Sequence, residues 1–204
     1  MEMRIINLNQ SSEEWLRWRE NRITATNAAS IMGLNPWQSR LELWQEKTLG
    51  WSKEPTLKEI ERMADGTRLE PFARDAFCKE IGAEFLPACI ENEDYSFLAA
   101  SFDGITSDYE HAVEIKCGKK AFILAQCDDM QSFTYAQIQH QIMVADLEFI
   151  YYYCFNGSEG ILNTVVKDNE FIDRMLAKEI EFWNLIQTFT SPELDYDAIR
   201  PVRT

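Results

Sequence analysis

The sequence predicts an α/β (α+β) domain, in which helices flank a central mixed five-stranded sheet. Two observations lead to this class. Up to residue 81 the apolar residues recur every three or four positions, as in amphipathic helices. From residue 83 the pattern changes to short runs rich in β-forming residues, which alternate with helical segments toward the C-terminus. Helices that alternate with strands favour a sheet covered by helices.

The first 55 residues are predicted to form an N-terminal helical lobe. Ser11 followed by Glu14 is a capping-box pattern, which marks the start of a helix. Two shorter helical segments follow and end at Gly33 and Gly50, because glycine is favoured just past a helix C-terminus. The expected helices cover residues 12–22, 27–32 and 39–50.

A long helical pattern then runs from Thr56 to Ile81. Gly66 interrupts it, and glycine lowers helix stability by about 1 kcal/mol relative to alanine. The segment is therefore expected to form either one helix with a break or two consecutive helices.

The rest of the chain supplies the sheet and three more helices. The expected strands cover residues 83–90, 96–108, 111–117, 147–155 and 160–166. The expected helices cover residues 119–130, 134–146 and 169–189. We interpret residues 1–204 as a single domain, with a core over 56–190 after the helical lobe of 1–55 and an irregular tail over 191–204.

Composition limits the possible functions. Twenty Lys and Arg against 34 Asp and Glu give a net charge of −14, which argues against a protein that coats nucleic acid with clustered basic residues. It does not exclude an enzyme that acts on DNA. The hydrophobic content of 46% excludes intrinsic disorder. Five cysteines without a C-x-x-C pair and no apolar run of signal-peptide or membrane length favour a reducing, cytoplasmic setting without membrane contact.

Acidic residues on two neighbouring strands suggest chemistry. Glu114 and Lys116 share one face of the strand 111–117, and Asp103 follows the apolar run 97–102 of the strand before it. Both carboxylates also have a plain structural interpretation. Glu114 could lie on a charged strand face that is turned to water, and Asp103 could be a turn residue before Gly104. If the two strands pair, the carboxylates meet at one end of the sheet, where a hard divalent cation would offset their repulsion.

Glu70 is a possible third carboxylate, because it lies beside the apolar face of its predicted helix. Its structural alternative is a solvated helix charge. Lys116 adds a group that a simple metal site does not need, since a cation can stabilise negative charge that develops on a phosphate.

This ordered set of residues resembles the PD-(D/E)XK nuclease superfamily, and within it the lambda-exonuclease-like, YqaJ-type phage recombination exonucleases. The resemblance rests on five segments that span most of the chain: RWRENRITAT, GTRLEPFARDAF, SFDG, VEIKC and TYAQIQHQ. It implies a single PD-(D/E)XK nuclease domain with a restriction-endonuclease-like core. One departure is visible, since Phe102 stands before Asp103 where the superfamily has a proline. That proline has no chemical role.

The resemblance implies the site residues one by one. Asp103, Glu114, the main-chain carbonyl of Ile115 and Glu70 would bind Mg²⁺, for which Mn²⁺ could substitute. The catalytic group would comprise Lys116, Glu114, Asp103 and Gln137, although Gln137 alone could equally be an exposed helix glutamine. Arg19 and Thr26 would hold the 5′-phosphate of the DNA end, with Arg22 as a substitute for Arg19. On residues alone, Arg19 and Thr26 could also be ordinary surface side chains.

The function implied is a Mg²⁺-dependent 5′-to-3′ exonuclease on linear double-stranded DNA, which releases 5′-mononucleotides and leaves a 3′ overhang. The implied partners are double-stranded DNA ends, a single-strand annealing protein and two further copies of the chain in a homotrimeric ring. Met63 is a candidate wedge between the strands. Trp15, Trp18 and Trp37 could stack on bases or belong to the core.

Two other functions stay open at this point. One is a different nuclease of the same superfamily, such as an endonuclease or a junction-cleaving enzyme. The other is an acidic interaction protein or DNA mimic, which the net charge would suit. A mimic, however, predicts carboxylates without a lysine among them.

Overall fold

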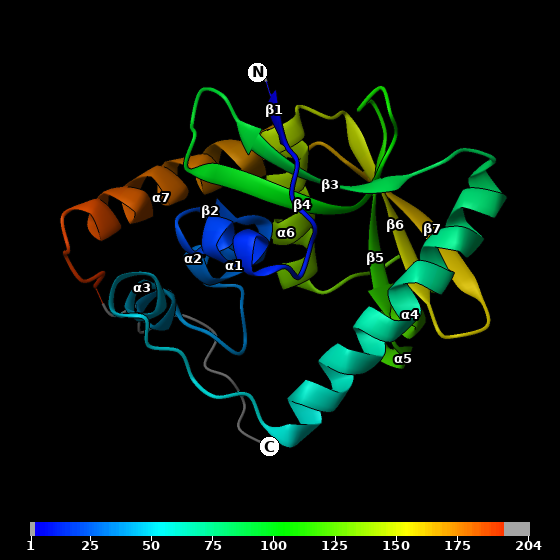
Figure 1. Cartoon of the computed structure of the whole chain (residues 1–204), viewed down its shortest axis with the longest axis horizontal. Helices are drawn as coiled ribbons and strands as arrows, with labels where there is room; N and C mark the ends of the chain where they lie inside the picture. The colour runs from blue at the N-terminus through cyan, green and yellow to red at the C-terminus, as the bar shows by residue number, and fades with distance from the viewer. Residues whose placement is uncertain (1–2, 194–204) are drawn as a thin grey trace.

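The structure of the chain is a computed structural model that describes residues 3–193. Residues 3–81 are mainly helical, and most of the sheet lies after residue 85 (Figure 1). The elements in chain order are β1 (Met3–Ile6), α1 (Glu13–Glu20), β2 (Ile23–Thr24), α2 (Ala25–Ile31), α3 (Arg40–Leu49), α4 (Leu57–Ile81), β3 (Leu86–Asn92), β4 (Leu98–Ile105), β5 (Ala112–Cys117), α5 (Lys119–Ala125), α6 (Ser132–Ala145), β6 (Phe149–Phe155), β7 (Gly160–Val166) and α7 (Asn169–Gln187).

A single mixed sheet forms the centre of the molecule. Its strand order is β1-β3-β4-β5-β6-β7, and β2 pairs with β4 beside this path. The β5–β6 and β2–β4 pairs are parallel, and the other pairs are antiparallel. The parallel β5–β6 pair needs a crossover, which α5 and α6 provide.

Helices cover both faces of this sheet. Side chains of α2, α3, α6 and α7 form the main core against one face, which includes Phe102 of β4 and Tyr152 of β6. On the other face, Ala73 and Phe77 of α4 pack on Val113 and Ile115 of β5. Figure 1 shows α4 as a long diagonal helix whose C-terminal half lies over β5, β6 and β7. The fold class predicted from the sequence is therefore confirmed.

The sheet is larger than predicted, because it has seven strands rather than five. The two additional strands lie in the segment that was expected to be only helical. β1 pairs with β3 through four residue pairs, and the two-residue β2 pairs with β4. Short strands of this kind leave little alternation in a sequence, and they form here because longer neighbouring strands offer a free edge.

The segment from Thr56 to Ile81 forms one continuous helix of 25 residues without a break at Gly66. A capping box of Thr56 and Glu59 starts it, and Gly82 ends it in a left-handed conformation with φ of 76°. Pro71 lies inside the helix on an exposed face, where water can satisfy the carbonyl group that loses its partner.

The five strands predicted from residue 83 onward are all present, and the last helix ends at Gln187. Residues 191–193 of the predicted tail have no regular structure, and residues 194–204 lie outside the described part of the chain. Within residues 3–193, every helix is too short or too polar to cross a membrane.

Candidate active site

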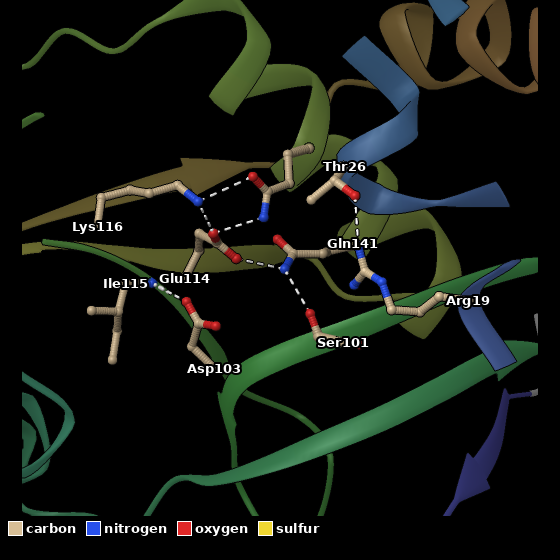
Figure 2. A network of polar contacts seen from close by, with 9 residues as sticks. Arg19, Thr26, Ser101, Asp103, Glu114, Ile115, Lys116 and Gln141 are labelled. Carbon is tan, nitrogen blue, oxygen red and sulfur yellow. Dashed lines mark hydrogen bonds and ion pairs between the residues drawn. The ribbon is translucent and has the colours of Figure 1, made fainter. Parts of the chain in front are cut away.

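The candidate site lies where β4 and β5 separate. These strands pair only at Gly104–Val113 and Ile105–Ala112, near the turn that joins them. Toward Ser101 and Glu114 the strands diverge, so their main-chain groups need other partners. The side chains of Asp103 on β4 and Gln141 on α6 supply two of these partners and place polar groups in the opening (Figure 2).

Asp103 occupies the branch point of this opening. Its Oδ2 accepts a hydrogen bond of 2.8 Å from the main-chain N–H of Ile115, in place of the ladder bond that the diverging strands no longer make. The side chain is half-buried. Asp103 is therefore not a simple turn residue, because its side chain joins the two strands at the point where the sheet opens.

Glu114 lies on β5 beside Lys116, and its side chain is almost fully buried. Its Oε1 accepts hydrogen bonds from Lys116 Nζ at 2.5 Å and from Gln137 Nε2 at 2.7 Å. Lys116 also donates to Gln137 Oε1 at 3.1 Å. The alternative of a charged face turned to water is therefore wrong for Glu114, because α6 covers this face of the strand and contributes Gln137.

Glu70 reaches the cluster from α4 and is half-buried. Arg74, one turn later, donates to Glu70 Oε1 at 3.4 Å and to the main-chain carbonyl of Asp103 at 2.7 Å. Arg74 thus connects the helix to the branch point of the sheet. Glu70 is not a freely solvated helix charge.

The electrostatics of the cluster reflect crowded carboxylates. Burial, together with the negative charges of Glu114 and Glu70, raises the pKa of Asp103 well above its usual value. Burial also raises the pKa of Glu70, although the nearby Arg74 opposes this. Such carboxylates are stabilised by an added positive charge, and Lys116 contributes one through its contact with Glu114.

This donor set suits a hard divalent cation, which prefers carboxylate and carbonyl oxygens. Asp103 and Glu114 supply the carboxylates, and Ile115, the residue after Glu114 on β5, supplies a main-chain carbonyl. Within residues 3–193, no three or more Asp, Glu, His or Cys side chains are grouped closely enough to hold a metal ion alone. The site would therefore combine two carboxylates with a main-chain oxygen, with Glu70 beside them.

Arg19 and Thr26 contact each other, and both line the cleft that contains the carboxylates. Arg19 Nη2 donates to Thr26 Oγ1 at 2.9 Å, and its guanidinium lies 4.3 Å from the ring centre of Trp15. Burial lowers the pKa of Arg19, but a guanidinium stays charged at neutral pH. The cleft has a volume of about 750 Å³.

Arg22 is not a substitute for Arg19. Its guanidinium forms a 2.6 Å ion pair with the buried carboxylate of Glu91, which Trp18 Nε1 and Arg4 also contact. These contacts with Glu91 connect α1 and β1 to β3. Arg22 therefore has a structural role, and so does Trp18.

Aromatic and apolar side chains line another part of the same cleft. Trp37 is 45% exposed, and its ring packs edge-on against Phe133 at 4.7 Å, with Arg62 at 5.4 Å from its centre. Met63 of α4 is also exposed in this cleft. Of the three tryptophans considered as base-stacking residues, Trp37 is the most exposed.

Sequence reasoning missed three side chains that hold the opening together. Gln141 donates to Glu114 and to the main chain of Ser101, Gln10 donates to the main chain of Phe102, and Arg74 connects α4 to β4. Gln141 could have been found, because it lies four residues after Gln137 and so on the same helix face. Gln10 lies in an irregular segment, where no periodic pattern marks it.

Comparison with known proteins assigns the chain to a family. Residues 14–148 match the YqaJ-like viral recombinase domain, so the chain belongs to this family. The match spans α1 to the end of α6 and includes all residues of the cluster. The chain is also 28% identical over 186 residues to the YqaJ protein of Bacillus subtilis (strain 168). The aligned region covers 87% of this chain and 57% of that protein. It thus spans little more than half of that relative's length.

Two solved exonuclease structures share the fold. An alkaline exonuclease of Laribacter hongkongensis has a TM-score of 0.73 at 20% identity, covering 87% of this chain and 94% of the other. A phage-related exonuclease of Haemophilus somnus 129PT has a TM-score of 0.60 at 13% identity, covering 83% and 96%. The sequence resemblance to lambda-exonuclease-like proteins is therefore confirmed at the level of family and fold.

Proposed function

We propose that the chain is a Mg²⁺-dependent exonuclease that degrades one strand of linear duplex DNA from its 5′ end and leaves a 3′ overhang. The observation that carries this proposal is the cluster of Asp103, Glu114 and Lys116 at the β4–β5 opening, in the same cleft as Arg19 and Thr26. The family and the shared exonuclease fold support it.

In this proposal Asp103, Glu114 and the carbonyl of Ile115 hold Mg²⁺ or Mn²⁺, with Glu70 completing the acidic cluster. The metal supplies Lewis-acid activation of water and stabilises charge on the phosphate. Lys116 keeps a positive charge next to the scissile phosphate, and Gln137 fixes the lysine and Glu114 relative to each other. These side chains need little reorganisation, because their hydrogen bonds already orient them.

Arg19 and Thr26 would bind the 5′-phosphate of the DNA end. An arginine presents forked donors that match a phosphate group, and the threonine hydroxyl adds one more donor. Since both residues line the cleft of the carboxylates, a bound terminal phosphate would place the first phosphodiester bond near the cluster. This arrangement would favour release of mononucleotides over internal cleavage.

The cellular role proposed is phage-type homologous recombination, in which a single-strand annealing protein takes up the 3′ overhang. The family description as a viral recombinase domain supports this role. A homotrimeric ring around DNA is also proposed. The N-terminal half of α4 exposes Leu57 and Ile60, which further copies of the chain would cover.

The experiment uses 5′-phosphorylated linear duplex, 5′-hydroxyl linear duplex and closed circular duplex, each with Mg²⁺ and with EDTA. Release of 5′-mononucleotides from the phosphorylated linear duplex, with the circle intact and EDTA inhibiting, is the expected result. Cleavage of the closed circle would instead identify an endonuclease of the same fold. Absence of cleavage of every substrate by the folded protein would contradict a nuclease function.

A further inference from the structure

Gln141 fills the space between the diverging strands. Its side chain is completely buried, and it comes from the middle of α6. The amide nitrogen donates to Glu114 Oε2 at 2.6 Å and to the main-chain carbonyl of Ser101 at 3.2 Å. Figure 2 shows Gln141 between Ser101 on β4 and Glu114 on β5. One side chain thus contacts both strands where they no longer pair.

These contacts determine the orientation of the amide. Glu114 Oε2 and the carbonyl of Ser101 are both acceptors, so the NH₂ group must face them. The buried Oε1 of Gln141 then has no hydrogen-bond donor among the described residues. An unpartnered buried polar atom destabilises the folded state, and its retention points to a requirement elsewhere in the site.

The contacts of Glu114 show what this requirement is. Its Oε1 accepts from Lys116 and Gln137, and its Oε2 accepts from Gln141. A carboxylate offers about four lone-pair positions, so three of them are used and the free one lies on Oε2. Gln141 occupies the other position on that oxygen and thereby sets the plane of the carboxylate.

We propose that Gln141 is a positioning residue for metal binding, which holds Glu114 so that Oε2 keeps one lone pair for the cation. It acts through Glu114 and touches neither metal nor DNA. The inference rests on the proposed metal-dependent nuclease function. Partners of metal-binding carboxylates typically change metal affinity by about 10- to 100-fold when they are replaced.

The test measures Mn²⁺ binding to the DNA-free protein by calorimetry and by the electron paramagnetic resonance signal of free Mn²⁺. Gln141→Met removes the amide at similar volume, and Gln141→Asn retracts it by one carbon. Gln139→Met is the matched control, because Gln139 is equally buried on α6 and also makes two hydrogen bonds, to Val166 and Asp168, away from the cluster. Unfolding in denaturant is measured for all variants.

Both Gln141 variants are expected to raise the Kd for Mn²⁺ about 10-fold or more, while the control stays within about twofold of the wild type. They should lower kcat without a matching change in KM for DNA. Folded Gln141 variants that bind Mn²⁺ as the wild type does would overturn the positioning role and leave the proposed function intact. A wild type that binds no Mn²⁺ would overturn both.

Discussion

Lys116 Nζ lies 2.5 Å from Glu114 Oε1, inside a cluster of three carboxylates from three different elements. Burial alone would lower the pKa of this lysine, but the negative charges of Glu114 and Asp103 outweigh it and raise the pKa. The ammonium group is therefore charged at neutral pH. A charged lysine among carboxylates distinguishes this site from the surface of an acidic DNA mimic.

Replacing Lys116 with alanine is expected to lower kcat by about 10³-fold, because a preorganised charge next to the phosphate is lost. DNA binding should change little, since one phosphate contact contributes only part of the affinity. Mononucleotide release at saturating 5′-phosphorylated duplex measures the effect. Lys79→Ala, at an exposed position in the last turn of α4, is the control. Equal loss in both variants would speak against a specific role.

Arg19→Ala is expected to remove the preference for a 5′-phosphate over a 5′-hydroxyl end, because the forked donors for the phosphate are lost. The measured quantity is the ratio of kcat/KM for the two substrates, which should approach one. Arg17→Ala removes an exposed arginine from the same helix and should keep the wild-type ratio. An unchanged ratio in Arg19→Ala would exclude Arg19 from phosphate binding.

Trp37→Ala is expected to weaken the binding of duplexes with unpaired ends by about 10-fold, since stacking of a base on an aromatic ring contributes about 1–3 kcal/mol. Fluorescence anisotropy with Ca²⁺ in place of Mg²⁺ measures this affinity. Trp51 has a similar exposed fraction, 51% against 45%, but does not line the cleft of the carboxylates. Trp51→Ala is therefore the control, and equal affinities of the two variants would contradict stacking at Trp37.

The buried carboxylate of Glu91 is expected to make the free energy of unfolding depend on pH. Burial acts to raise its pKa, but hydrogen bonds from Arg4 and Trp18 and the charge of Arg22 outweigh burial and lower it. A carboxyl whose pKa is lower in the folded state contributes stability above its usual pKa of 4.5, and the contribution is lost as the pH falls through the folded-state pKa. Glu91→Gln should reduce the free energy of unfolding by roughly 2 kcal/mol at pH 7.

The difference between wild type and Glu91→Gln should then shrink below pH 4.5, as the wild-type carboxyl becomes protonated. Urea unfolding at a series of pH values measures it. Glu93→Gln, at an exposed position nearby, should leave the unfolding free energy nearly unchanged. A difference for Glu91→Gln that is independent of pH would contradict the role of its charge.

Much of the fold could be predicted from local pattern. Short runs rich in β-forming residues indicated the five longer strands, and apolar residues at helical spacing from Thr56 to Ile81 indicated α4. The short strands β1 and β2 could not be predicted, because their pairing depends on partners about 75 to 90 residues away. Gly66 suggested a break because its local propensity is weak, whereas a capping box, a C-terminal glycine and the packing of Phe77 keep α4 continuous.

The candidate site was predictable where residues are close in sequence. Asp103, Glu114 and Lys116 lie on adjacent strands, so their proximity follows from pairing. The burial of Glu114 could not be predicted from the alternation of its strand, since α6 covers that face. The ion pair of Arg22 with Glu91 was equally hidden, because it joins segments 69 residues apart.

The proposed nuclease depends on Asp103 and Glu114, which would hold the metal at the opening of the sheet. The decisive measurement is the release of 5′-mononucleotides from 5′-phosphorylated linear duplex with Mg²⁺, by the wild type and by Asp103→Ala. The wild type is expected to degrade the duplex, and folded Asp103→Ala is expected to lose activity by at least about 10³-fold. Activity retained in Asp103→Ala would contradict the proposed site.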